Sequence, residues 1–163
     1  MEYQAGCIGR IFVARIDHGE DLLAELKGLA KLEDIRQAFF ILIGAVRDMR
    51  LVTGPKRDTV PPDPVWSSIT DVQEIVGVGN ILWQDDDLPA IHLHAALGRD
   101  EATRVGCLRE RVSVYLTVEA FIIEMTDVAD TTDAGTRVVE RIRDDALGIA
   151  RMSMQGSFAR NIN

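Results

Sequence analysis

Hydrophobic and polar residues alternate along several stretches of the chain, and this two-residue period predicts β-strands. Other stretches are short, continuous and apolar, which indicates strands buried on both faces. The predicted strands cover residues 8–16, 35–46, 49–52, 72–83, 90–97 and 112–125. The last of these is apolar on both faces, so we expect it to be central in a sheet or covered by a partner subunit.

One segment departs from the two-residue period. Apolar side chains recur at helical spacing between residues 22 and 31, which predicts one amphipathic helix packed on a sheet. Asp17 and Glu20 have the spacing of a capping box at the start of this helix. Gly44 interrupts an apolar strand and predicts a bulge or bend there.

The remaining segments are less regular. Residues 54–64 contain four prolines in a polar stretch, which predicts an exposed loop. The C-terminal region has two interpretations: a late strand or intersubunit arm over residues 148–152, or a helix. The helix would use an apolar stripe of Val138, Val139, Ile142, Ala146 and Ile149. From residue 155 onward we expect a frayed end.

Composition favours one globular domain, since 47% of the 163 residues are hydrophobic. No apolar run approaches the ~20 residues of a membrane-spanning helix. Residues 1–6 lack the basic and apolar blocks of a signal peptide. Two cysteines, Cys7 and Cys107, are too few for a disulfide framework. We therefore expect a soluble cytoplasmic protein with reduced thiols and no membrane contact.

The charge balance weighs against nucleic acid as a direct partner. The formal net charge is −8 and the sequence pI is about 4.8. Nucleic-acid affinity comes largely from Lys and Arg side chains that neutralise phosphates. The densest basic group, Arg104, Arg109 and Arg111, is interrupted by Glu101 and Glu110, so a solvated turn of mixed charge is favoured.

The strand over residues 90–97 carries the clearest candidate chemistry. His92 and His94 are two of only three histidines, and their spacing places both imidazoles on one face of that strand. Together with the thiol of Cys107 they form a nitrogen and sulfur set that suits zinc. The alternative is that the histidines are hydrogen-bonded polar residues or line a subunit interface, and that Cys107 is an inert buried thiol.

An ordered set of short motifs resembles the plants-and-prokaryotes-conserved (PPC) domain. The resemblance runs from about residue 9 to residue 125, with a weaker echo over residues 141–152. None of these motifs is specific alone, and their order carries the resemblance. The motifs are Arg15-Ile16-Asp17-His18-Gly19-Glu20-Asp21-Leu22, Ile43-Gly44-Ala45-Val46, Glu74-Ile75-Val76-Gly77-Val78-Gly79-Asn80, His92-Leu93-His94, Gly106-Cys107-Leu108 and Glu119.

The resemblance implies an α+β fold with a mainly antiparallel sheet, one packed helix and a homotrimeric assembly. Residues 1–163 would form one domain, with a core at about 8–126 and a C-terminal segment, 127–163, of uncertain structure. Some prokaryotic members resemble metal-binding proteins that use the histidine pair and a later histidine. That later position reads Gly-Gly-His-Leu in the family but Val105-Gly106-Cys107-Leu108 here, so Cys107 replaces the expected third histidine.

The resemblance leaves three functional interpretations open. The leading one is a stand-alone trimeric binding or regulatory module, with a metal or small-ligand pocket at His92, His94 and Cys107 and other proteins as further partners. The second is a small zinc enzyme resembling acetolactate decarboxylase, with Glu119 as the suggested general base unless it pairs with Arg109 or Arg111. The third is a structural scaffold. Plant members reach DNA through an AT-hook, and this sequence contains none.

Overall fold

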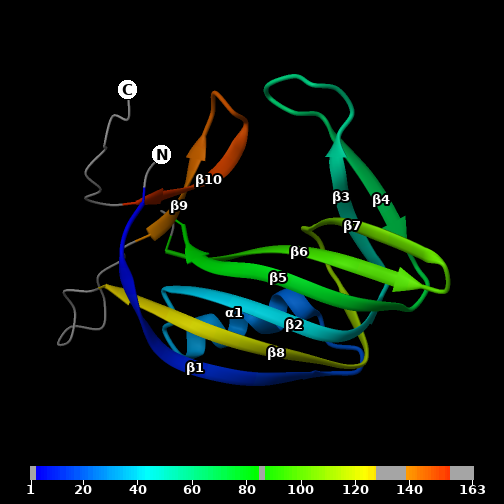
Figure 1. Cartoon of the computed structure of the whole chain (residues 1–163), viewed down its shortest axis with the longest axis horizontal. Coiled ribbons are helices and arrows are strands. Elements are labelled where there is room, and N and C mark those ends of the chain that lie inside the picture. The colour runs from blue at the N-terminus through cyan, green and yellow to red at the C-terminus, as the bar shows by residue number, and fades with distance from the viewer. Residues whose placement is uncertain (1–2, 85–86, 128–138, 155–163) are drawn as a thin grey trace.

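The computed structural model describes residues 3–84, 87–127 and 139–154. Within this part of the chain, ten strands and one helix form a mainly antiparallel α+β fold (Figure 1). The elements are β1 (Gly6–Asp17), α1 (Leu22–Leu32), β2 (Gln37–Arg47), β3 (Met49–Pro55), β4 (Pro64–Ile69), β5 (Gln73–Trp83), β6 (Pro89–Arg99), β7 (Ala102–Leu108), β8 (Ser113–Asp127), β9 (Val139–Asp144) and β10 (Ile149–Met154).

Eight of the strands form one sheet in the order β1-β8-β2-β5-β6-β7-β3-β4. The long strand β8 lies between β1 and β2, so its expected central position is confirmed. β9 and β10 form a separate hairpin, which touches the large sheet through a parallel bridge between Gln84 and Arg141.

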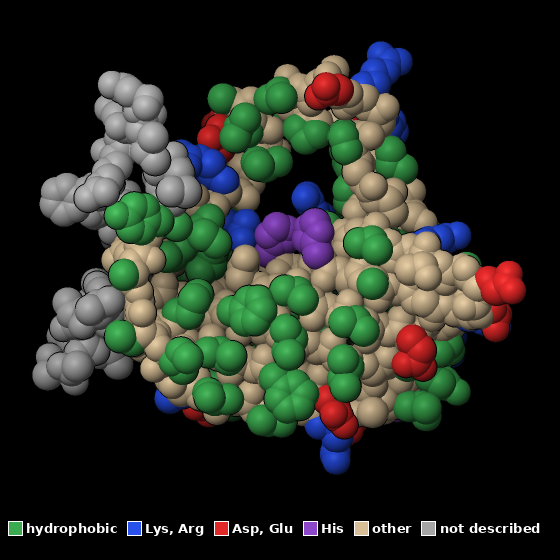
Figure 2. Space-filling view, in the orientation of Figure 1, with side chains coloured by type: hydrophobic (Ala, Val, Ile, Leu, Met, Phe, Trp, Pro, Cys, Tyr) green, Lys and Arg blue, Asp and Glu red, His purple; other side chains and the backbone are tan. Residues whose placement is uncertain are grey.

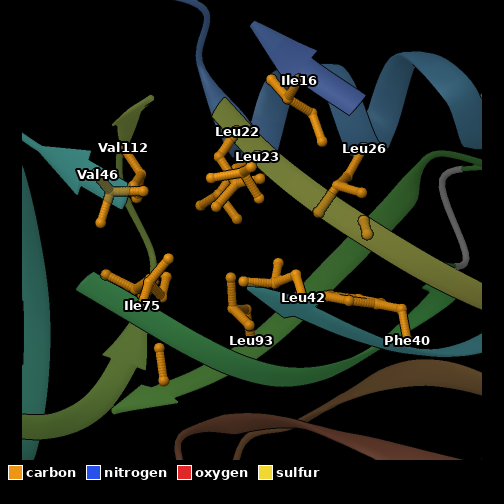
Figure 3. Packing of buried hydrophobic residues seen from close by; sticks show 14 of the residues in the cluster. Ile16, Leu22, Leu23, Leu26, Phe40, Leu42, Val46, Ile75, Leu93 and Val112 are labelled. Carbon is orange, nitrogen blue, oxygen red and sulfur yellow. The ribbon is translucent and has the colours of Figure 1, made fainter. Parts of the chain in front are cut away.

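The core fills the space between α1 and one face of the large sheet. The helix contacts β6 and β8. Figure 3 shows the side chains of Leu22, Leu23 and Leu26 from the helix, with Phe40 and Leu42 from the sheet facing them. Because side chains alternate along a strand, this leaves the odd-numbered residues of β2 on the opposite face.

The predicted helix is confirmed, but its cap is not the predicted one. Asp21 is the N-cap, and its Oδ1 accepts hydrogen bonds from the N–H groups of Leu23 (3.1 Å) and Ala24 (3.4 Å). Glu20 accepts a bond from the Asp17 N–H (2.7 Å), which closes the preceding turn instead of opening the helix. The carboxylate of Asp21 therefore caps the first turn of α1.

The bend predicted at Gly44 is confirmed. The register between β2 and β8 shifts between Gly44 and Ala45, and Leu116 on β8 adopts a positive φ of 60°. The Leu116 N–H donates to Nδ1 of His18 (3.0 Å), so His18 supports this bulge, away from β6.

One other expectation is wrong, and two strands of the sheet have no counterpart among the predicted ones. Residues 139–144 and 149–154 form strands, so the C-terminal helix is wrong and the late strand is confirmed; Val138 and residues 155–163 lie outside the described residues. β4 and β7 were not predicted, because β4 begins at Pro64 in the proline-rich stretch and four residues of β7 are exposed. Neither segment shows clean alternation of apolar and polar residues.

The sheet face opposite α1 is apolar and exposed. Its central side chains are 40–61% exposed: Phe39, Ile41, Ile43, Val76 and Val78. Figure 2 shows green side chains spread across this side of the molecule. No helix in the described part of the chain has the length and apolar character that a membrane crossing requires.

Candidate metal centre

His92 and His94 lie on one face of β6, as the two-residue period predicts, and this is the sheet face opposite α1. Leu93, between them, is fully buried in the core on the other face. The two imidazole rings are 5.0 Å apart between centroids and are inclined at 76°. Figure 2 shows two histidine side chains together at the margin of an opening in the molecular surface, with Lys or Arg side chains beside them.

The antiparallel pairing of β6 with β7 brings Cys107 to this pair. Cys107 is directly opposite His94 in the register, so both side chains project from the same face. One ligand atom from each of His92, His94 and Cys107 lies within 4.8 Å of the other two. Ligand atoms around a tetrahedral zinc ion are roughly 3.5 Å apart, so small side-chain rotations would bring the three into coordination distance.

Burial decreases across the three side chains. Cys107 is buried with 4% exposure, His92 is intermediate and His94 is exposed. A metal held here would have a protein side and an open side. Three protein ligands with an open fourth position are typical of catalytic or ligand-binding zinc sites, whereas structural sites have four protein ligands.

The electrostatic environment keeps His92 neutral. Burial, followed by the positive charge of Arg141, lowers the pKa of His92 from 6.5 to about 4, with smaller contributions from His94 and Arg109. At neutral pH the imidazole therefore has a free nitrogen lone pair, which is the form that binds metals.

Two arginines border the site. The Nε–H of Arg109 donates to Sγ of Cys107 at 3.4 Å, and a cationic donor stabilises the negative charge that a metal-bound thiolate carries. Arg141, on β9, is 9% exposed and donates through Nη2 to Oδ1 of Asn80 (2.9 Å). Asn80 is the register partner of His92, so the Arg141 guanidinium lies next to that histidine.

Sequence patterns did not assign a role to Arg141 or Asn80. Both lie in stretches that carry the family resemblance, but nothing in their local sequence indicates that β9 packs beside β5. The long-range contact between the hairpin and the sheet creates this part of the site.

Glu119, the suggested general base, is not part of the site. It lies on β8, and β2 and β5 separate β8 from β6. Three interstrand spacings place it roughly 14 Å from the histidine strand. Glu119 lines a different cavity of about 490 Å³ together with Glu74. Arg109, one of its expected partners, donates to Cys107 instead.

The family is decided by a match between residues 3–126 and the model of the Plants and Prokaryotes Conserved (PCC) domain. This is the domain, also abbreviated PPC, that the ordered motifs resemble. The chain belongs to this family. The PCC domain covers every strand of the large sheet except the last residue of β8, and it contains all three candidate metal ligands. Among curated proteins, none matches the sequence.

Solved structures share the PCC fold. A metal-containing protein from Archaeoglobus fulgidus is similar with a TM-score of 0.76 and 24% identity, covering 93% of this chain and 98% of that one. A plant- and prokaryote-conserved protein from Pyrococcus horikoshii has a TM-score of 0.73 and 23% identity, covering 93% and 97%. A protein from Ralstonia eutropha JMP134 with a provisional DNA-binding label has a TM-score of 0.65 and 20% identity, covering 87% and 90%.

Proposed function

We propose that this protein is a single-domain, homotrimeric PCC module that binds zinc through His92, His94 and Cys107 and presents the metal to a small ligand. The observation that carries the proposal is the convergence of three ligand atoms within 4.8 Å from side chains on two adjacent strands. The donor set, two imidazoles and one thiol, is one that zinc prefers.

Several features of the site support zinc. His92 is neutral at pH 7, and the Arg109 guanidinium compensates the charge of a thiolate. The similar Archaeoglobus protein is described as metal-containing. Bound zinc would supply a Lewis acid at the exposed side of the site. Cys107 in place of the family's usual histidine keeps a ligand and makes the set softer.

A binding module is favoured over an enzyme of the decarboxylase kind. That chemistry needs a general base near the metal, and the one that the sequence suggested, Glu119, is three strands away from β6. Direct DNA binding is also disfavoured. Related structures carry provisional DNA-binding labels, but this chain has a net charge of −8 and lacks an AT-hook.

Metal content tests the proposal. Untagged protein purified without chelator is expected to hold about one zinc per chain by mass spectrometry of the metal. His92→Ala should fall to roughly a tenth of this content or less, because it removes a direct ligand. His18→Ala is the matched control, since His18 bonds to the Leu116 backbone and lies outside the site. A metal-free wild type, or equal zinc in all three proteins, contradicts the proposal.

The exposed apolar face supports the trimer. Large contiguous apolar surfaces mark interaction sites, and the strands β2 and β5 present one. In a light-scattering or sedimentation measurement, the wild type is expected at three times the 18.0 kDa chain mass. Ile41→Asp, which places a charge in the middle of this face, should dissociate the trimer.

Leu32→Asp is the control for this substitution. Leu32 is 80% exposed at the end of α1, on the other side of the sheet, so the same charge there should leave the mass unchanged. A monomeric wild type, or an Ile41→Asp protein of unchanged mass, refutes the trimer.

A further inference from the structure

Arg141 is one of two buried polar side chains among the described residues, and hydrogen bonds hold it from two directions. Its Nη1 donates to the Ala150 carbonyl on β10 (3.0 Å), and its Nη2 donates to Oδ1 of Asn80 on β5 (2.9 Å). These two bonds fix the guanidinium plane between the β9–β10 hairpin and the strand next to His92. The side chain is thus preorganised beside the metal site.

One donor of this guanidinium has no acceptor. The Nε atom of Arg141 is buried and makes no hydrogen bond. Buried polar groups in proteins are nearly always paired, and an unpaired charged donor is particularly unfavourable. A free donor on this guanidinium, which lies next to His92 through its bond to Asn80, indicates that an acceptor from outside the chain binds there.

The positive charge around the site favours the binding of an anion. Arg141, His94 and Arg109 are the charged or titratable side chains that act on His92, and none of them carries a negative charge. A divalent metal with one thiolate would add a further net positive charge. An anionic ligand at the open position would compensate this charge and accept the free Nε–H.

The surface around the site has room for such a ligand. Figure 2 shows an opening directly above the paired histidines. The turn between β9 and β10 touches the loop between β3 and β4, since a Cβ on Gly148 would lie 2.5 Å from Cβ of Pro61. The hairpin and the loop therefore meet beyond the site and border the opening.

We propose that this opening binds a small oxyanion, a carboxylate or a phosphate, between the metal and the Nε–H of Arg141. One oxygen occupies the open metal position and another accepts the arginine donor. The inference rests on the proposed zinc site for the first contact. Arg141 supplies the second contact and acts as the specificity-determining residue.

The test is calorimetric titration of the zinc-loaded full-length protein with acetate and with inorganic phosphate, at constant ionic strength set by chloride. Zinc content is measured on the same samples. Arg141→Met removes the donor, and Arg143→Met removes the same charge from the same strand at an exposed position paired with Asp145. We expect at least one oxyanion to bind the wild type with a Kd of about 10 mM or tighter.

Arg141→Met should weaken this binding by about tenfold or more, whereas Arg143→Met should leave it within about twofold. Binding of acetate alone assigns a carboxylate ligand, and binding of phosphate alone assigns a phosphate. Equal oxyanion affinity in zinc-loaded wild type and Arg141→Met overturns this inference and leaves the zinc proposal intact.

Absence of zinc from the wild type overturns the zinc proposal and the bridging contact with it. If Arg141→Met does not fold, Arg141→Lys provides the comparison, because lysine keeps the charge but lacks the planar donor set. A zinc-loaded wild type that binds neither oxyanion overturns the inference without any variant.

Discussion

Gly44→Ala is expected to lower the free energy of unfolding by about 3 kcal/mol or more. This is the largest effect expected among alanine substitutions at Gly28, Gly44 and Gly54. Gly44 has φ of +144°, a conformation that side chains other than glycine rarely adopt. A Cβ there would also overlap the carbonyl oxygen of Thr117 and approach Cα of Val118 to 2.8 Å. Both neighbours are backbone atoms of β8, so the strand itself would have to move.

Alanine substitutions at two other glycines separate the effect of the positive φ from the effect of the steric overlap with β8. Gly54 has φ of +135°, and no atom lies within 4 Å of the place that an alanine methyl group would take, so Gly54→Ala measures the backbone conformation alone. Gly28 lies within α1 with free space and an ordinary φ, so Gly28→Ala should be neutral or stabilising by up to about 1 kcal/mol.

Urea denaturation of the four proteins at one fixed protein concentration gives the comparison, since assembly makes stability depend on concentration. The expected order of stability is Gly28→Ala, wild type, Gly54→Ala, Gly44→Ala. A Gly44→Ala protein no less stable than Gly54→Ala would show that the close approach of β2 and β8 is not a constraint.

Cys107→Ser is expected to reduce zinc affinity by about 100-fold or more, an effect at least as large as the loss of a supporting residue around a metal. Serine has nearly the same size as cysteine, so the buried position should remain filled. The hydroxyl, however, replaces a soft thiolate ligand and leaves two imidazoles. Competition with a zinc-binding dye measures the affinity.

Cys7→Ser is the matched control for this substitution. Cys7 is the other cysteine of the chain, and it is exposed on β1, an edge strand that four other strands of the sheet separate from β7. Its replacement should leave zinc affinity unchanged. Equal affinities of Cys107→Ser and Cys7→Ser would show that the thiol is a packing residue and that zinc, if bound, uses only the histidines.

Much of the fold could be predicted from the sequence, because its main signals are local. The helical spacing of Leu22, Leu23 and Leu26 and the two-residue period of the strands both reflect burial against one core. Asp21 was missed as the cap because Asp17 and Glu20 have the same sequence signature one turn earlier. The match to the PCC family confirms the resemblance carried by the ordered motifs.

The candidate site could be predicted only in part. The period of a strand is enough to place His92 and His94 on one face, and the family pattern added Cys107. The structure brings the three side chains together. Their role as metal ligands stays a prediction. Arg141 could not be placed, because its position depends on a hairpin that reaches the sheet from the far end of the chain. No local pattern encodes that contact.

X-ray absorption at the zinc edge of the purified protein tests the central claim most directly, since it reports the atoms bound to the metal. The His92, His94 and Cys107 site predicts one sulfur at about 2.3 Å, with nitrogen or oxygen neighbours at about 2.0–2.1 Å. The sulfur contribution should disappear in Cys107→Ser. A zinc spectrum without sulfur in the wild type, or protein that holds no zinc after equilibration with one equivalent, would contradict the proposed centre.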